Sequence, residues 1–339
     1  MTHTVPTTQL TPDRPLVWET PTTLRVGFDR VVARVEAASP QTQRVIAMLV
    51  HGATAEELAR HDPGEAQRVL DALRPALVAR ERLVDPVADQ LPAEADGGPP
   101  TRLSAAPHAP VSPALRHASM ELAYSARSVA TRQRLRTAIY DDGRALPGLR
   151  QALEANRLCS CERSGGEPEL AIEVLRYLEP LGRSSRWLRA GVPHLLIRFT
   201  DDAARVGPLV SASGAPCHGC EALHLTDQDP ALPAISAQLY GWVPGSEAPE
   251  TMPFVGAAAA HYIACWRRGA RWVHKRQLIL PVEHGALAAL PSFTTLTTHP
   301  ECGCAIRSAP RPPPRTATVA EMSAPHSRSP TSAVNRALS

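Results

Sequence analysis

The sequence predicts an α/β protein with two domains, a small one near the N-terminus and a larger one in which strands and helices alternate. Three observations lead to this prediction. Short β-like runs precede three helical segments in the first 85 residues, apolar strands alternate with helices from about residue 135, and two closely spaced cysteine pairs lie far apart in the chain. The 339 residues leave room for two domains, because domains commonly span about 100–200 residues.

Residues 14–85 are expected to form the small domain. The β-like runs cover residues 15–20, 24–28 and 30–37. A first helix should then end at Gly52, and Thr54 with Glu57 forms a capping box that opens a second helix. A third helix is expected over 64–73. Strands combined with three short helices are typical of a winged helix-turn-helix domain.

The charges of the third helix distinguish between DNA binding and peptide binding, the two functions considered for such a domain. A DNA recognition helix brings several basic side chains to phosphates, but here Arg68 and Arg74 are balanced by Glu65 and Asp71. The balance argues against nucleic acid and favours a peptide that adds as a strand beside the third β-run. The predicted peptide-binding residues are Val31, Arg34, Val35, Gln67, Arg68 and Asp71.

Composition divides the rest of the chain. Residues 86–116 are rich in Pro and Ala and predict a linker, residues 117–305 the larger domain, and residues 306–339 a disordered basic tail. The tail has five Arg and one Glu, so that its +4 leaves about −1 for the rest of a chain with net charge +3. No folded part therefore has the charge expected of a nucleic-acid-binding protein.

The larger domain is expected to contain a parallel sheet of Rossmann type. Apolar strands are predicted over 135–140, 158–161, 171–174, 194–199 and 206–210, helices over 145–155 and 184–190, and a late strand over 271–280. Strands that alternate with helices in this way are typical of βαβ units, which produce parallel sheets. His194, at the start of a buried strand, is expected to be a core histidine with its hydrogen bonds satisfied.

A Rossmann nucleotide site needs glycines directly after the first strand, so that backbone N–H groups can approach phosphates. This chain has Asp141-Asp142-Gly143-Arg144 there, and the two carboxylates would repel phosphate. Gly143 and Glu162 are weak candidates for a residual nucleotide site. Lys275, the chain's single lysine, lies far along the sequence. ATP is therefore not expected as a cofactor.

Cys217-x-x-Cys220 and Cys302-x-Cys304 have the spacing of a four-cysteine zinc site. Four thiolates complete the coordination sphere, so the zinc is expected to be structural. His218 is an alternative ligand, and two accidental pairs of small buried residues are the alternative to a metal site. Reduced thiols, the lack of an N-terminal apolar signal segment and the lack of a membrane-spanning run predict a cytoplasmic location.

Several motifs together resemble one family, the ThiF-like cyclodehydratase partner proteins of thiazole/oxazole-modified microcin (TOMM) biosynthesis. The motifs are residues 190–199, 206–210, 216–220, 223–224, 226–231, 238–239 and 299–304. In that family the two cysteine pairs are similar to the zinc pairs of ubiquitin-activating-type adenylyltransferases. The likeness is weakest over 135–165, where this chain lacks the glycine motif of those enzymes.

The resemblance implies that residues 14–85 form a precursor recognition element, in which Arg34 and Arg68 pair with acidic residues of a leader peptide. It implies a non-catalytic partner of a separate YcaO-type cyclodehydratase in the synthesis of a bacteriocin-like peptide. Because proteins of the ThiF type are often dimers, it also implies a homodimer. Two alternatives stay open. One is an active adenylyltransferase that activates a carboxylate with ATP, and the other is a zinc-containing winged-helix regulator that binds DNA.

Overall fold

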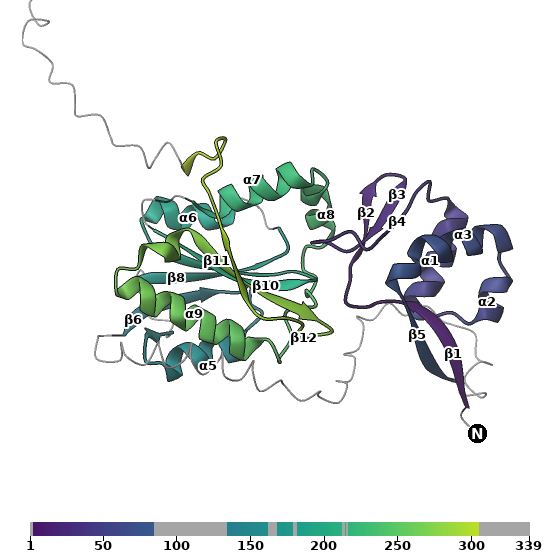
Figure 1. Ribbon diagram of the computed structural model, residues 1–339, viewed down its shortest axis with the longest axis horizontal. Coiled ribbons are helices and arrows are strands. Elements are labelled where there is room, and N and C mark those ends of the chain that lie inside the picture. Colours follow the sequence, from purple (N-terminus) through teal and green to yellow (C-terminus); the bar gives the residue numbers. More distant parts are fainter. Residues whose placement is uncertain are drawn as a thin grey trace, which may run out of the picture. The chain divides into compact units, whose positions relative to one another are not determined.

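The computed structural model describes residues 3–84, 134–161, 168–178, 182–211, 214 and 216–304 (Figure 1). The expected linker at 86–116 and the expected tail at 306–339 lie outside these residues. Among the residues that the structure describes, no helix has both the length and the apolar composition to cross a membrane.

The N-terminal domain contains three helices and two small antiparallel sheets. Its elements are β1 (His3–Leu10), β2 (Leu16–Thr20), β3 (Thr23–Val26), β4 (Ala33–Val35), α1 (Pro40–His51), α2 (Ala55–Ala59), α3 (Pro63–Leu73) and β5 (Leu77–Val84). One sheet has the order β2-β3-β4, and β1 pairs with β5 in the other. Strand β1 lies before residue 14, where the domain was expected to begin.

The third expected strand, 30–37, is shorter in the structure. It is limited to β4, because residues 27–32 form the turn that reverses the chain after β3. Gly27 has φ +99°, and a Cβ at this position would lie 2.2 Å from Arg30 O. The turn therefore requires glycine, and it uses residues that the sequence pattern had assigned to the strand.

Helix boundaries in this domain follow their capping residues. At α2, Thr54 Oγ1 accepts from the Glu57 N–H at 3.1 Å and Glu57 Oε2 accepts from the Thr54 N–H at 2.7 Å. This reciprocal pair satisfies two backbone donors that the helix leaves unpaired, as the sequence predicted. The helices bury their apolar sides, including Leu49 and Leu73, in a core shared with Val35 of β4.

The larger domain is built on one mixed sheet. Its strands are β6 (Leu135–Tyr140), β7 (Cys159–Ser160), β8 (Leu170–Arg176), β9 (His194–Phe199), β10 (Ala203–Val210), β11 (Arg276–Glu283), β12 (Ala286–Leu287) and β13 (Ser292–Thr295). The order is β12-β11-β10-β9-β8-β6-β7, and β13 also pairs with β11. Its helices are α5 (Pro147–Ala155), α6 (Gly182–Ala190), α7 (His218–Gln228), α8 (Leu232–Gln238) and α9 (Met252–Arg267).

The expectation of a parallel sheet is correct for one half of it. Strands β7, β6, β8 and β9 are parallel, whereas β10 to β13 are antiparallel to their neighbours. Only three residues, 200–202, connect β9 to β10. Because a parallel neighbour needs a long crossover connection, so short a link produces an antiparallel pair.

The late strand predicted over 271–280 begins later than expected. Arg271–His274 form a short 3₁₀ helix, Lys275 follows it, and β11 then runs to Glu283. The 3₁₀ helix places Trp272 against the ring of Tyr262, with the ring centroids 5.1 Å apart. This aromatic contact fills the end of the core, so the segment before β11 turns inward instead of extending the sheet.

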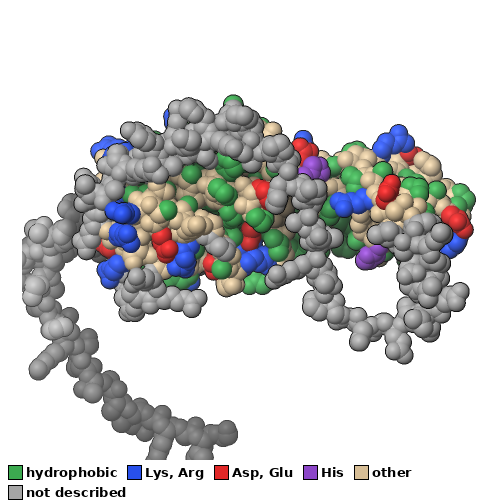
Figure 2. All heavy atoms as spheres, turned by 90° about the horizontal axis from the view of Figure 1, so that it is seen from below, with side chains coloured by type: hydrophobic (Ala, Val, Ile, Leu, Met, Phe, Trp, Pro, Cys, Tyr) green, Lys and Arg blue, Asp and Glu red, His purple; other side chains and the backbone are tan. Residues whose placement is uncertain are grey.

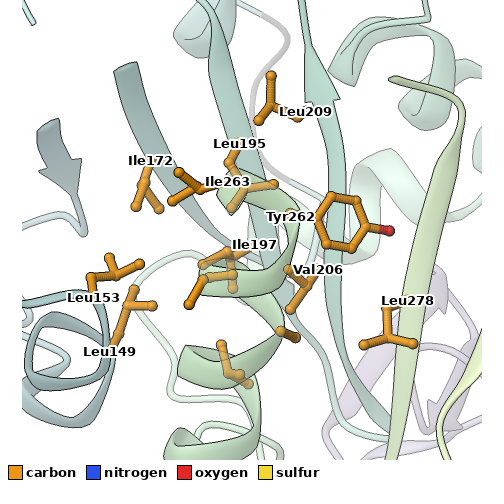
Figure 3. Close-up of a cluster of buried hydrophobic side chains, with 14 of the residues drawn as sticks. Leu149, Leu153, Ile172, Leu195, Ile197, Val206, Leu209, Tyr262, Ile263 and Leu278 are labelled. Carbon is orange, nitrogen blue, oxygen red and sulfur yellow. The ribbon is translucent and has the colours of Figure 1, made fainter. Parts of the chain in front are cut away.

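Helices cover both faces of this sheet (Figure 1). Helices α5 and α9 pack on one face, where Leu149, Leu153, Ile197 and Ile263 belong to the main core (Figure 3). On the other face Leu188 of α6 packs against a cluster that contains cysteines of α7. The two layers therefore leave α7 on the face opposite α5 and α9.

Close contact between α5 and α9 depends on glycine. A Cβ at Gly256 of α9 would lie 2.4 Å from the Cβ of Ala152, and one at Gly148 of α5 would lie 2.7 Å from the Cβ of Met252. Real Cβ atoms do not approach so closely, so any larger residue would separate the two helices and open the core between them.

His194 at the start of β9 is fully buried, as expected, but only part of its hydrogen bonding is satisfied. Its Nδ1 lies 3.2 Å from Val192 O, whereas its Nε2 has no hydrogen-bond partner in the part of the chain that the structure describes. Burial lowers the pKa of this imidazole to about 4. The side chain is therefore neutral near pH 7.

Acid should destabilise the protein partly through His194. The unfolded chain takes up this proton near the ordinary pKa of 6.5 and the folded chain only near about 4, so stability is lost as the pH falls through that window. The loss attributable to this residue is at most ~3 kcal/mol. Chemical denaturation at pH 7 and pH 4.5 should show a smaller loss for His194→Leu than for the wild type. His51→Gln, at an exposed position, should keep the wild-type loss, and equal losses in all three proteins would contradict this assignment.

Candidate functional site

The four predicted cysteines come together at the N-terminus of α7. Cys217 Sγ lies 3.5 Å from Cys302 Sγ, and Cys220 Sγ lies 3.3 Å from Cys304 Sγ. All four sulfurs lie within 4.8 Å of one another, and none forms a disulfide. A tetrahedral site with Zn–S bonds of about 2.3 Å places sulfurs about 3.8 Å apart, so the cluster fits one zinc ion.

Helix α7 contributes charge as well as position. Cys217 is its N-cap residue and Cys220 lies in its first turn, where the partial positive charge of a helix N-terminus favours thiolates. A hydrogen bond from Cys217 lowers the pKa of Cys220, and the same bond together with burial raises the pKa of Cys217. The helix N-terminus and this hydrogen bond therefore both favour the thiolate form of Cys220, which is the form that binds a cation.

Gly219 keeps the centre of the cluster open. A Cβ on this residue would lie 3.2 Å from Cys302 Sγ and 3.5 Å from Cys217 Sγ. The first distance is shorter than an ordinary contact, so a side chain here would displace a sulfur. The glycine between the first two cysteines thus lets Cys302 lie close to Cys217 without this shift.

A buried polar network holds α7 on the sheet. Arg198 of β9 donates to Glu221 Oε2 at 3.0 Å, and Gln277 of β11 donates to Glu221 Oε1 at 2.8 Å. Arg198 also donates to His218 Nδ1 at 3.2 Å. All four residues are at most 5% exposed. His218 therefore faces the sheet, and it does not join the sulfur cluster as the alternative ligand considered from the sequence.

The remaining cysteines belong to the core. Cys159 and Cys161 are buried beside β7, and Cys265 is buried in α9. Burial raises the pKa of Cys159 to about 12, so this thiol is not reactive near neutral pH. The interpretation of Cys159 and Cys161 as strand-associated core residues agrees with this environment.

A cavity of about 650 Å³ lies at the carboxyl ends of β6 and β8, between the loop after β6 and helices α7 and α8. Ligands of doubly wound sheets bind at this edge. Its charged lining residues are Asp142, Arg144 and Arg176. Arg176 is paired with Glu247 at 2.6 Å, and Arg144 donates to Gly241 O at 3.0 Å. The sequence offered no local signal for these two arginines, because their partners are distant in the chain.

The loop after β6 has few backbone N–H groups that are available to bind a phosphate. The Gly143 N–H, which a phosphate would need, donates instead to Asp141 Oδ1 at 3.2 Å. Asp142 and Gly143 both have positive φ, so the chain makes a tight turn here. The other weak candidate, Glu162, lies outside the described residues.

One outer edge of the β2-β3-β4 sheet is open. The Gly27 N–H donates to Pro15 O at 2.9 Å, so alternate residues of β3 direct their backbone groups toward β2. Val26 then faces β4, where it pairs with Ala33. The backbone N–H and C=O of Arg34 consequently point away from β3, to a side where no strand of the described residues pairs with β4.

Helix α3 borders this open edge. Arg68 of α3 donates to Glu36 O at 3.1 Å, two residues beyond Arg34 on the same outward side. Gln67 and Asp71 are exposed on α3, Val31 is partly buried, and the side chain of Val35 is fully buried in the core. Of the predicted peptide-binding residues, Val35 can therefore contribute only through its backbone.

Both predicted charge contacts already have partners within the protein. Arg34 donates to Glu19 Oε1 at 2.7 Å, and this pairing lowers the pKa of Glu19. Arg68 donates to Glu65 Oε1 at 2.7 Å, and this pairing lowers the pKa of Glu65 to about 2. An acidic peptide side chain would have to compete with these carboxylates.

The opposite edge of the same sheet is occupied. The Trp18 N–H of β2 donates to Gln238 Oε1 at 2.9 Å, and Gln238 Nε2 donates to Trp18 O at 2.8 Å. The amide of Gln238 thus takes the place of a neighbouring strand. Gln238 belongs to a motif that resembles the family, but this role was not predictable from the sequence because 220 residues separate the partners.

Comparison with known proteins gives matches only among solved structures. No protein-family model matches this chain, and no curated protein matches it. Two matches are heterocyclases. One is described as a heterocyclase in complex with substrate and cofactor (16% identity, TM-score 0.41), and the other is the heterocyclase TruD (18% identity, TM-score 0.41). Each match covers 88% of this chain, but only 39% and 43% of the respective heterocyclase.

A third match is E. coli MccB with MccA, at 8% identity and a TM-score of 0.35, covering 88% of this chain and 99% of MccB. This chain thus spans about two fifths of the length of the two heterocyclases and nearly the full length of MccB. At these identities and TM-scores the likeness says nothing about the chemistry of this chain.

Purified protein should contain about one zinc ion per chain, because four sulfurs meet at a spacing that suits tetrahedral zinc. Cys217→Ser and Cys302→Ser should each lose most of the metal, and elemental analysis measures this. Chelation should lower the melting temperature, since the metal joins distant segments of the larger domain. Cys265→Ser, which removes a buried thiol elsewhere, should keep its zinc. Full zinc content in both the Cys217 and Cys302 variants would refute the site.

Proposed function

We propose that this chain is a non-catalytic partner protein that binds the leader of a ribosomally made precursor peptide and presents it to a separate YcaO-type cyclodehydratase. The winged-helix interpretation of the N-terminal domain and the structural role of zinc are parts of this proposal. The observation that supports it best is the open backbone of Arg34 on β4, with α3 beside it.

Strand addition needs an outer strand whose backbone N–H and C=O groups are unpaired, as those of Arg34 on β4 are among the described residues. A peptide laid along β4 would exchange hydrogen bonds with the Arg34 backbone, while α3 offers the exposed side chains of Gln67 and Asp71. The other outer strand, β2, is closed to a second peptide by Gln238. Among the described residues, this sheet therefore has one outer strand without a partner, which suits the binding of one extended peptide segment.

The DNA-binding alternative lacks free basic charge on α3. Arg68 is paired with Glu65 within α3, and Arg74, the C-cap residue of α3, is paired with Asp71. On the face drawn in Figure 2, Lys and Arg side chains lie next to Asp and Glu side chains. Phosphate binding requires basic side chains that are not already neutralised, so this alternative is disfavoured.

The adenylyltransferase alternative has the cavity in its favour and the loop chemistry against it. Isolated protein should give no measurable ATP–pyrophosphate exchange with a candidate precursor, because Asp141 occupies the Gly143 N–H and Asp142 adds negative charge. Exchange that disappears in Arg144→Ala would support the adenylyltransferase instead. A known adenylyltransferase, assayed in parallel, serves as the positive control.

Arg34→Pro should abolish peptide binding. Proline removes the outward N–H and its ring obstructs a neighbouring strand, so at least ~1.4 kcal/mol, or tenfold in affinity, should be lost. Arg34→Gln keeps the N–H and loses only the charge, so it should bind within a few fold of wild type. Fluorescence titration of the full chain with the labelled precursor, and separately with a DNA duplex at physiological salt, measures both.

The paired variants separate backbone from side-chain recognition. An equal loss of peptide affinity in Arg34→Pro and Arg34→Gln would mean that the peptide is recognised by the guanidinium group and that strand addition is wrong. Tight, salt-dependent DNA binding without peptide binding would favour the regulator. Circular dichroism of each variant checks that the N-terminal domain is still folded.

A further inference from the structure

A second cluster of metal-ligating side chains lies beside the cysteines. His224 and Asp227 of α7 and His299 of the segment before Cys302 have ligand atoms within 4.8 Å of one another. The two imidazole rings meet edge to face, with centroids 4.8 Å apart. His299 is only 3% exposed. A three-ligand metal site is the first explanation to test.

The hydrogen bonds argue against a metal at this cluster. The Glu301 N–H donates to His299 Nδ1 at 3.1 Å. A ring nitrogen that accepts a hydrogen bond carries no hydrogen, so the hydrogen of His299 is on Nε2, which donates to Asp227 Oδ2 at 2.9 Å. A metal on Nε2 would move the hydrogen to Nδ1, directly against the Glu301 N–H. Metal binding would therefore break the turn that leads to Cys302.

A parallel contact lies one turn earlier on α7. His224 Nε2 lies 3.1 Å from Thr297 O and donates to it. The turn itself is closed by the Cys302 N–H, which donates to His299 O at 3.0 Å. Thus two side chains of α7 hold residues 297–299 in place. The short turn from His299 to Cys302 then determines where the second cysteine pair lies.

We propose that His224 and Asp227 form a clasp that positions Cys302 and Cys304 opposite Cys217 and Cys220 before any metal binds. The proposal rests on the proposed metal site, and it makes the two α7 residues positioning residues that do not touch the ion. Helix α7 then supplies two thiolates directly and fixes the other two through the clasp. A site assembled in advance binds its ion more tightly, because less chain must be ordered on binding.

The experiment uses the full chain in metal-free and zinc-loaded form. Asp227→Ala should weaken zinc binding about tenfold in competition with a chromophoric chelator. Asp227→Asn keeps an oxygen that accepts from His299 Nε2, so it should recover most of that affinity. Glu283→Ala, which removes an exposed carboxylate on β11, should bind zinc like the wild type. In metal-free Asp227→Ala, the amides of Glu301 and Cys302 should exchange hydrogen faster than in the wild type.

Each outcome separates the clasp from the metal site on which it rests. Wild-type protein without zinc would reject the metal site, while slow exchange at Glu301 that Asp227→Ala accelerates would still support the clasp. Unchanged exchange and unchanged zinc affinity in Asp227→Ala would overturn the clasp. A second metal ion per chain that Asp227→Ala removes would also overturn it, in favour of a three-ligand site.

Discussion

The buried ion pair between Arg198 and Glu221 is the constraint on which the rest of the larger domain depends. It fixes α7 to β9, and Gln277 extends the same network to β11. Leaving either charge buried without its partner would cost about 3–5 kcal/mol, so the helix has one position on the sheet. The polar side of α7 is therefore used for orientation, whereas α9 packs on the opposite face mainly through apolar side chains, with one hydrogen bond from Tyr262 Oη to Arg276 O of β11.

Three features of the molecule follow from that placement of α7. Its N-cap residue is Cys217, its first turn provides Cys220, and its later turns hold the segment that leads to Cys302. Just beyond its end, Asp229 forms an ion pair with Arg25, a buried residue of β3. One helix and its C-terminal continuation thus connect the cysteine cluster, the sheet and the N-terminal domain.

The two outer strands of the β2-β3-β4 sheet differ in whether their outward backbone groups are already hydrogen bonded. A three-stranded sheet has two outer strands with unpaired backbone groups, and either could accept a peptide. Gln238 satisfies the N–H and C=O of Trp18 on β2, whereas the corresponding groups of Arg34 on β4 have no such partner among the described residues. In the proposed binding mode, Gln238 of the larger domain thus occupies the β2 edge and leaves the β4 edge for the peptide.

The sequence by itself determined the features that depend on neighbouring residues. Three features were predictable: the capping box of Thr54 and Glu57, the bounds of β6 and β9, and the clustering of the four cysteines. Each of them is encoded within a few residues or in a fixed ligand spacing. Only the tertiary structure decided that half of the sheet is antiparallel, that β1 pairs with β5, and that Gln238 closes β2. These features join side chains or strands that are far apart in the chain, and a local pattern carries no information about which distant partner will satisfy a given backbone group.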